Sequence, residues 1–238
     1  MSVEEYAKQG YEQLQQEDYQ KARQFFQQAL IVEDTHPDSL YGLARSQFKL
    51  EQYEESVQAF DRLINLLPNN AVYYSERGVA LHWIGNNQLA LEDFDRAVEL
   101  EPQNPYRYSS RAYIKDRLRD FQGAIDDYSK AIELDPEDAI AYNNRGLIEE
   151  KLGYMEKAKR SYQQADQLDK SSNGSIVNGS AKREKEVSQS PQTTSLPLEQ
   201  KTTQQGWSNY WPVIRSVFTD RDQLNDFIQF VNPFRKKA

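Results

Sequence analysis

Residues 71–104 read AVYYSERGVALHWIGNNQLALEDFDRAVELEPQN, and this 34-residue pattern recurs without insertion from residue 3 to residue 172. One column of the repeat holds the small residues Gly10, Ala44, Gly78, Ala112 and Gly146. Two more columns hold Ala22, Ser56, Ala90, Ala124 and Ala158, and Ala29, Leu63, Ala97, Ala131 and Ala165. An aromatic column holds Phe26, Phe60, Phe94, Tyr128 and Tyr162. A fixed period of about 20 to 50 residues indicates stacked copies of one supersecondary unit.

Each copy contains two helical stretches, which in residues 71–104 are predicted at 72–84 and 88–100. Gly85 and Asn86 end the first stretch, because glycine tolerates the left-handed backbone of a helix exit. Pro102 ends the second, because proline disfavours helix at the residue before it. The sequence therefore predicts ten helices, with the small residues and the aromatic column packed between them.

The order of small, aromatic, small and proline residues in each copy resembles the tetratricopeptide repeat (TPR) family. The resemblance implies an all-α fold, a right-handed α-solenoid of five helix-turn-helix units at 3–36, 37–70, 71–104, 105–138 and 139–172. Ser56 and Leu63 are mild departures from the pattern. Lys159 and Asp166 replace apolar residues where a sixth copy would dock, so the array is expected to be complete at five copies.

Composition limits the kinds of function. The net charge is −8, and residues 1–170 hold 31 acidic and 20 basic side chains, which disfavours nucleic acid as a partner. There is no cysteine. The first residues lack the basic and apolar regions of a signal peptide, and no long apolar stretch is present, so we expect a cytoplasmic protein.

The last third of the chain has two different compositions. Residues 173–205 are rich in Ser, Asn, Gly, Gln, Thr and Lys, and are predicted to be a disordered linker. Residues 206–238 are predicted to form short amphipathic helices. Because isolated short helices are marginally stable in water, this tail is expected to dock on something. Its docking residues are predicted to be Trp207, Tyr210, Trp211, Ile214, Phe218, Leu224, Phe227, Ile228 and Val231.

The family resemblance also implies a binding groove lined by the first helix of each copy. Carried onto this sequence, the peptide-binding groove residues are Lys8, Tyr11, Tyr41, Arg45, Phe48, Lys49, His82, Trp83, Tyr106, Tyr113, Arg117, Asn143, Asn144 and Lys151. Aromatic and basic side chains in alternation suit a peptide with apolar and acidic side chains. The carboxylate clamp with which one subclass of the family binds chaperone tails is absent from every three-copy window.

Catalysis has little support in the sequence. His36 and His82 are the only histidines, and neither has a cysteine or a close second histidine to complete a metal site. The adjacent acidic pairs, among them Asp126-Asp127 and Glu149-Glu150, are interpreted as ordinary solvated positions. No phosphate loop or nucleophile motif is present, so we expect no enzyme, no cofactor and no metal.

Three functions remain open. The leading one is a protein–protein interaction scaffold or adaptor, modulated by its own tail, in which residues 206–231 compete with outside ligands for the groove. The second is a peripheral membrane adaptor, with the aromatic tail in the lipid interface. The third is self-association through the tail. The sequence does not identify the partner protein or peptide.

Overall fold

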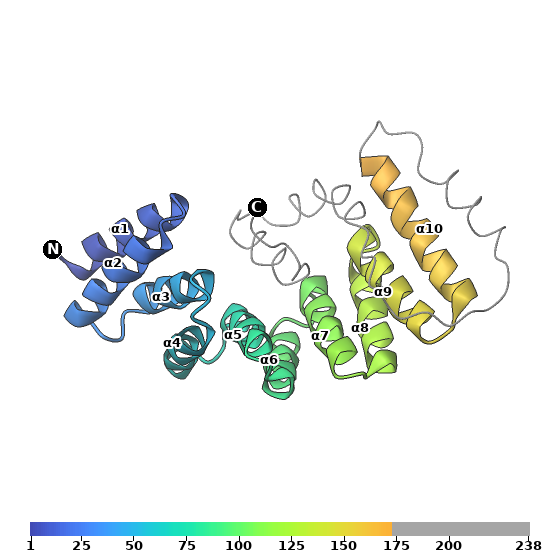
Figure 1. Ribbon diagram of the computed structural model, residues 1–238, viewed down its shortest axis with the longest axis horizontal. Helices are drawn as coiled ribbons and strands as arrows, with labels where there is room; N and C mark the ends of the chain where they lie inside the picture. The colour runs from blue at the N-terminus through green and yellow to red at the C-terminus, as the bar shows by residue number, and fades with distance from the viewer. Residues whose placement is uncertain (173–238) are drawn as a thin grey trace, which may run out of the picture.

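The computed structural model describes residues 1–172, which form ten α-helices without a strand (Figure 1). The helices are α1 Val3–Gln15, α2 Tyr19–Val32, α3 Pro37–Lys49, α4 Tyr53–Leu66, α5 Ala71–Trp83, α6 Asn87–Leu100, α7 Pro105–Arg117, α8 Phe121–Leu134, α9 Ala139–Lys151 and α10 Met155–Ser172. The ten predicted helices are confirmed. The predictions for the linker 173–205 and the tail 206–238, with its nine docking residues, lie outside the described residues.

The helices pack as five successive pairs. The two helices of each copy pack together, and the second helix of one copy packs on the first helix of the next. The row of pairs bends into an open arc, in which α3 and α5 lie on the inner side of α4 and α6 (Figure 1). The predicted α-solenoid is therefore confirmed, and the odd-numbered helices form its inner layer.

The columns of small and aromatic residues form the core. Phe26, Phe60 and Phe94 are at most 1% exposed. A Cβ atom on Gly10 would lie 2.6 Å from the Phe26 ring, and one on Gly42 in the next copy would lie 2.2 Å from it. The ring of Phe26 thus fills a slot between two helices whose backbones approach because glycine has no side chain.

Side-chain caps fix where most helices begin. Ser2 and Glu5 form a reciprocal capping box at α1. The side chains of Asn70, Asn104 and Asp138 accept a hydrogen bond from backbone N–H groups at the start of α5, α7 and α9. Asp18, Asn86 and Asp120 do the same for α2, α6 and α8.

The turn within each copy contains one residue in the left-handed region. It is Gly85 (φ 82°) in the third copy, as predicted, but Arg119 (φ 64°) at the equivalent position of the fourth. A residue with a Cβ atom is disfavoured in this region, because the Cβ atom approaches the following carbonyl oxygen. Arg119 therefore holds a conformation better suited to glycine.

Replacing Arg119 with glycine is expected to stabilise the protein. The removed strain outweighs the added freedom of the unfolded chain, for a net gain of about 0.5–1 kcal/mol. Urea unfolding followed by circular dichroism measures the gain. The control is Arg96→Gly in the interior of α6, where glycine is expected to cost about 1 kcal/mol. If both variants lost the same free energy of unfolding, the conclusion that Arg119 is strained in the left-handed region would be contradicted.

Arginines of the odd helices connect three helices at a time. Arg77 in α5 donates from Nη1 to Asp61 of α4 (2.6 Å), and from Nε and Nη2 to Asp93 of α6 (2.9 and 2.6 Å). Arg111 in α7 repeats this arrangement one copy later, between Asp95 and Asp127. We call these two sets the arginine staples. In the fifth copy Arg145 meets the hydroxyls of Ser129 and Ser161 instead, both at 3.2 Å.

Contacts between neighbouring helices correct one prediction. Asp127 and Glu149, expected to be solvated, are each 5% exposed. Asp127 accepts hydrogen bonds from Arg111 and pairs with Lys115 at 2.8 Å, and Glu149 accepts a hydrogen bond from Ser161. The expectation failed because it considered only the helix that carries each acid, whereas the neighbouring helices supply its partners.

Candidate functional site

The inner layer of the arc presents one stripe of side chains from each odd helix. In α7 the stripe contains Ser110, Tyr113 and Arg117, whose spacings of three and four residues place them on one helix face. The equivalent stripes of α1, α3, α5 and α9 continue the surface, and α1 contacts α3 as α5 contacts α7. We call this surface the concave face.

Five residues on α1, α3 and α5 form a tyrosine cluster in the first half of the concave face. Tyr41 donates a hydrogen bond to Glu76 at 2.6 Å, and its ring lies 5.6 Å from that of Tyr73. The guanidinium of Arg45 lies over the Tyr41 ring at 5.5 Å. Tyr11 donates to a backbone carbonyl of α3 at 2.9 Å. The cluster ties three successive copies together.

Burial keeps these phenols protonated. It raises the pKa of Tyr11 well above its ordinary value, with a further contribution from the Asp38 carboxylate. Burial also raises the pKa of Tyr73. Both hydroxyls therefore stay neutral near pH 7 and can donate hydrogen bonds.

A second group of rings, which we call the aromatic row, comprises Phe48, Tyr53, Trp83, His82 and Tyr113. Phe48 meets Tyr53 edge-on at 5.2 Å, and Tyr53 stacks on Trp83 at 5.5 Å with an interplanar angle of 11°. His82 meets Tyr113 edge-on at 5.4 Å. The row runs without a gap across α3, α4, α5 and α7.

His82 is part of the row as a neutral ring. Burial lowers its pKa, and Arg117 lowers it further, while the hydrogen bond with Asn87 opposes them. Its Nδ1 atom lies 2.6 Å from Oδ1 of Asn87. The imidazole is therefore uncharged near neutral pH and acts as an aromatic surface there.

Cations continue the row toward the last copy. Arg117 is exposed, donates to the Tyr113 hydroxyl at 2.8 Å and lies over its ring at 4.7 Å. Lys151 pairs with Asp116 at 2.7 Å and lies 5.9 Å from the Phe121 ring. Such cation–π contacts leave part of the charge facing water, where a carboxylate can approach.

The structure brings seven of the 14 predicted groove residues into these two groups, and Arg117 and Lys151 lie at the end of the aromatic row. Phe48 and Arg45 are each 7% exposed, so they support the surface more than they offer contacts. Lys8 is exposed and pairs loosely with Glu12 at 4.0 Å, and Lys49 is half-buried. The remaining predicted residues lie on α7 and α9 and belong to neither group. They are Tyr106, Asn143 and Asn144, all half-buried.

Four members of the surface were not predicted from the sequence: Tyr53, Tyr73, Glu76 and Phe121. Tyr53 and Phe121 begin the second helix of their copies, as Tyr19 does in the first copy. Three of the five residues in that column are aromatic, the other two being Asn87 and Met155, and this was a visible signal. It was missed because only first helices were expected to line the groove.

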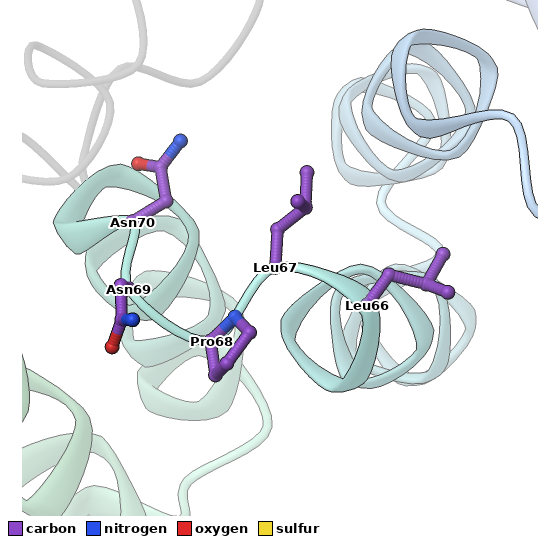
Figure 2. A pocket seen from close by; sticks show the side chains of 5 residues that line it. All are labelled: Leu66, Leu67, Pro68, Asn69 and Asn70. Carbon is purple, nitrogen blue, oxygen red and sulfur yellow. The ribbon is translucent and has the colours of Figure 1, made fainter.

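A shallow hollow lies away from the concave face, at the connection between α4 and α5. It has a volume of about 260 Å³ and is lined by Leu66, Leu67, Pro68, Asn69 and Asn70 (Figure 2). Leu66 and Leu67 are about 40% exposed. The hollow offers apolar contacts, and no charged side chain lines it.

Two further kinds of site were sought in the part of the chain that the structure describes. None of its helices combines the length and apolar character that crossing a bilayer requires. Within the same residues, no three His, Asp or Glu side chains gather closely enough to hold a metal ion.

Family models match three parts of the chain. Two described as tetratricopeptide repeat match residues 13–75 and 139–172, and one described as TPR repeat matches residues 120–153. No curated protein matches the chain.

Solved structures resemble the fold closely. A crystal structure of MamA matches with a TM-score of 0.66 at 20% identity, over 70% of this chain and 97% of that one. MamA from Desulfovibrio magneticus RS-1, residue 41 to the end, matches with a TM-score of 0.67 at 21% identity, over 71% of this chain and 96% of that one. YrrB, a TPR protein with an unusual peptide-binding site, matches with a TM-score of 0.60 at 21% identity, over 68% of this chain and 84% of that one. At these identities the likeness concerns the fold alone.

Proposed function

We propose, from the premise that this chain belongs to the tetratricopeptide repeat family, that it is a non-catalytic scaffold whose concave face binds a partner peptide. The described residues share their fold with YrrB, a TPR protein with a peptide-binding site, and this supports the proposal. The choice of face and of ligand chemistry is our proposal.

One observation carries it: the aromatic row and its cations lie on one face of an otherwise acidic array. Trp83 and Tyr113 are half-buried, so each keeps part of its ring exposed. The indole N–H of Trp83 is buried and has no hydrogen-bond partner among the described residues, so the ring offers its exposed apolar part to a ligand. Aromatic rings and arginine that are already held in place lose little freedom on binding, which is why such residues dominate protein interfaces.

The same observation indicates the chemistry of the partner. Arg117 and Lys151 favour carboxylates, and the rings favour apolar or aromatic side chains. The expected ligand is therefore a peptide with acidic and aromatic residues. The resemblance to YrrB is consistent with a peptide ligand, although its site is not carried over residue by residue.

An array of random 12-residue peptides tests the proposal. Bound peptides are expected to be enriched in Asp, Glu and aromatic residues. Replacing Arg117 with glutamate should weaken binding of a selected acidic peptide at least tenfold, because attraction becomes repulsion at close range. Replacing Trp83 with alanine should cost about 2 kcal/mol, or roughly 30-fold in affinity. Fluorescence anisotropy measures both.

Arg119→Glu is the matched control. Arg119 is also exposed and lies two residues from Arg117, but it belongs to the turn after α7. Its reversal should change affinity less than threefold. Circular dichroism verifies that each variant is folded. If Arg117→Glu and Arg119→Glu lost the same affinity for the peptide, a site on the concave face would be refuted. The loss would then follow from the change in overall charge and not from the position of Arg117.

The remaining expectations belong to the same proposal. We propose that the scaffold acts in the cytoplasm without enzymatic activity or cofactor. The peripheral membrane adaptor depends on residues 206–238, outside the described part, and no observation on residues 1–172 favours it.

A further inference from the structure

The concave face is less acidic than the array around it, although Glu12, Asp38, Glu76 and Asp116 lie beside its cations. Its stripes contain the cations Lys8, Arg45, Lys49, Arg117 and Lys151. Two of the carboxylates nearby already have partners, since Glu76 accepts the Tyr41 hydrogen bond and Asp116 pairs with Lys151. The arginine staples, by contrast, place Arg77 and Arg111 among aspartates between the helices. An acidic segment is thus repelled less by this face than by the rest of the array, and Arg117 and Lys49 offer it basic partners there.

The chain itself contains a segment with the complementary composition. Residues 206–231 include Tyr210, Trp211, Phe218 and Phe227, and their three aspartates at 220, 222 and 226 outnumber two arginines at 215 and 221. Asp222 and Asp226 are four residues apart and share a face of the helix that the pattern predicts there. Aromatic rings and carboxylates are the ligand chemistry that the concave face favours.

The spacing along the chain allows this segment to reach the face. Helix α10 ends at Ser172, and 33 residues separate it from residue 206. A flexible chain of that length spans roughly 30 Å on average. Packed helices lie about 8–10 Å apart, so α5 and α7 are within that distance of the last copy.

The tether also makes weak binding effective. The effective concentration of a segment on such a linker is on the order of 1 mM. A segment with a dissociation constant of about 100 μM would then occupy its site roughly 90% of the time.

We propose that residues 206–231 of the same chain bind the concave face over the aromatic row, with their aspartates toward Arg117 and Lys49, and so compete with outside peptides. This inference rests on the proposed function, because it takes the same face as the binding site. The hollow at Leu66–Asn70 is also apolar, but it offers the three aspartates no charged partner (Figure 2).

The test uses the full chain and a charge-reversed form, Asp220→Lys, Asp222→Lys and Asp226→Lys. Hydrogen exchange of the α5 and α7 amides is expected to speed up in the variant, because the segment leaves the face. An acidic–aromatic peptide should bind the variant about tenfold more tightly than the native chain, because it no longer competes. The matched control reverses Glu184 and Glu186 in the intervening stretch and should change neither quantity.

A charge swap makes the test specific. Adding Arg117→Glu and Lys49→Glu to the charge-reversed chain should restore slow exchange in α5 and α7, because the attraction is rebuilt with opposite signs. Exchange is measured at two protein concentrations tenfold apart. Protection that is the same at both supports a contact within one molecule, whereas protection lost on dilution identifies a second copy and overturns the proposal.

The other outcomes separate the two proposals. Unchanged exchange in the charge-reversed chain, with peptide still bound through Arg117, overturns tail docking and leaves the proposed function intact. Faster exchange confined to the end of α4 and the connection to α5 places the segment near the hollow and also overturns tail docking on the concave face. Faster exchange in α5 and α7 without any peptide that binds either chain supports tail docking and contradicts the scaffold function.

Discussion

Replacement of Phe94 with alanine is expected to lower the free energy of unfolding by about 3–5 kcal/mol, because it removes a fully buried ring and leaves a cavity. Phe94 is 0% exposed and packs with Leu81, Ala90 and Ile114. Ile114 belongs to α7, so the ring joins the third copy to the fourth. In a solenoid each copy is stabilised mainly by its neighbours, so the loss at a middle junction should also broaden the unfolding transition.

Urea unfolding followed by far-ultraviolet circular dichroism measures this effect. Leu89→Ala is the control on the same helix, since Leu89 is 44% exposed, and its cost should stay within about 0.5 kcal/mol. A cost below about 1.5 kcal/mol for Phe94→Ala, near the low end for large core truncations, would contradict its place as the core of this junction.

Replacement of Arg77 with alanine is expected to cost about 3–5 kcal/mol, because it leaves the Asp93 carboxylate buried without its partner. The Asp93 side chain is 5% exposed, whereas that of Asp61, the other partner, is 48% exposed and remains hydrated. Arg96→Ala is the control: its pair with Glu99 lies on the surface within one helix, and such pairs contribute at most about 0.5 kcal/mol.

The same variant should show a characteristic pH dependence. Burial raises the pKa of Asp93, and the hydrogen bonds from Arg77 oppose that rise. Without Arg77 the pKa rises further. A carboxyl group whose pKa is higher in the folded than in the unfolded state contributes stability that is lost as the pH rises through the folded value. The cost of Arg77→Ala should therefore be smaller at pH 4, where Asp93 can be protonated, than at pH 7.

A double variant separates the charge effect from lost packing. Arg77→Met with Asp93→Leu removes both charges and keeps apolar volume, so it should be less destabilising than Arg77→Ala alone. A double variant as unstable as the single one at pH 7 would show that the staple contributes through packing instead of through the buried ion pair.

Much of this protein follows from its 34-residue period. The columns through Gly10 and Phe26 predict which helices approach and which ring fills the space, because these contacts depend on spacing along the chain and on residue size. The groove residues implied by the family resemblance come from the first helix of each copy, and a fixed register places equivalent positions on the same helix face. Binding at that surface stays a prediction.

The partners of individual side chains were not predictable in the same way. Arg77 and Arg111 each join acids 16 residues before and after them in the chain, and Asp127 and Glu149 are buried although their own helices suggested solvation. Tyr53 reached the aromatic row from a second helix.

The sequence by itself determined the number of helices, their order and their buried faces, since each depends on local spacing and side-chain volume. Only the tertiary structure decided which charges are buried and which rings stack, because these depend on how neighbouring helices are placed against one another. The angle and separation of packed helices set distances of a few ångströms between side chains, and a repeat pattern does not encode distances on that scale.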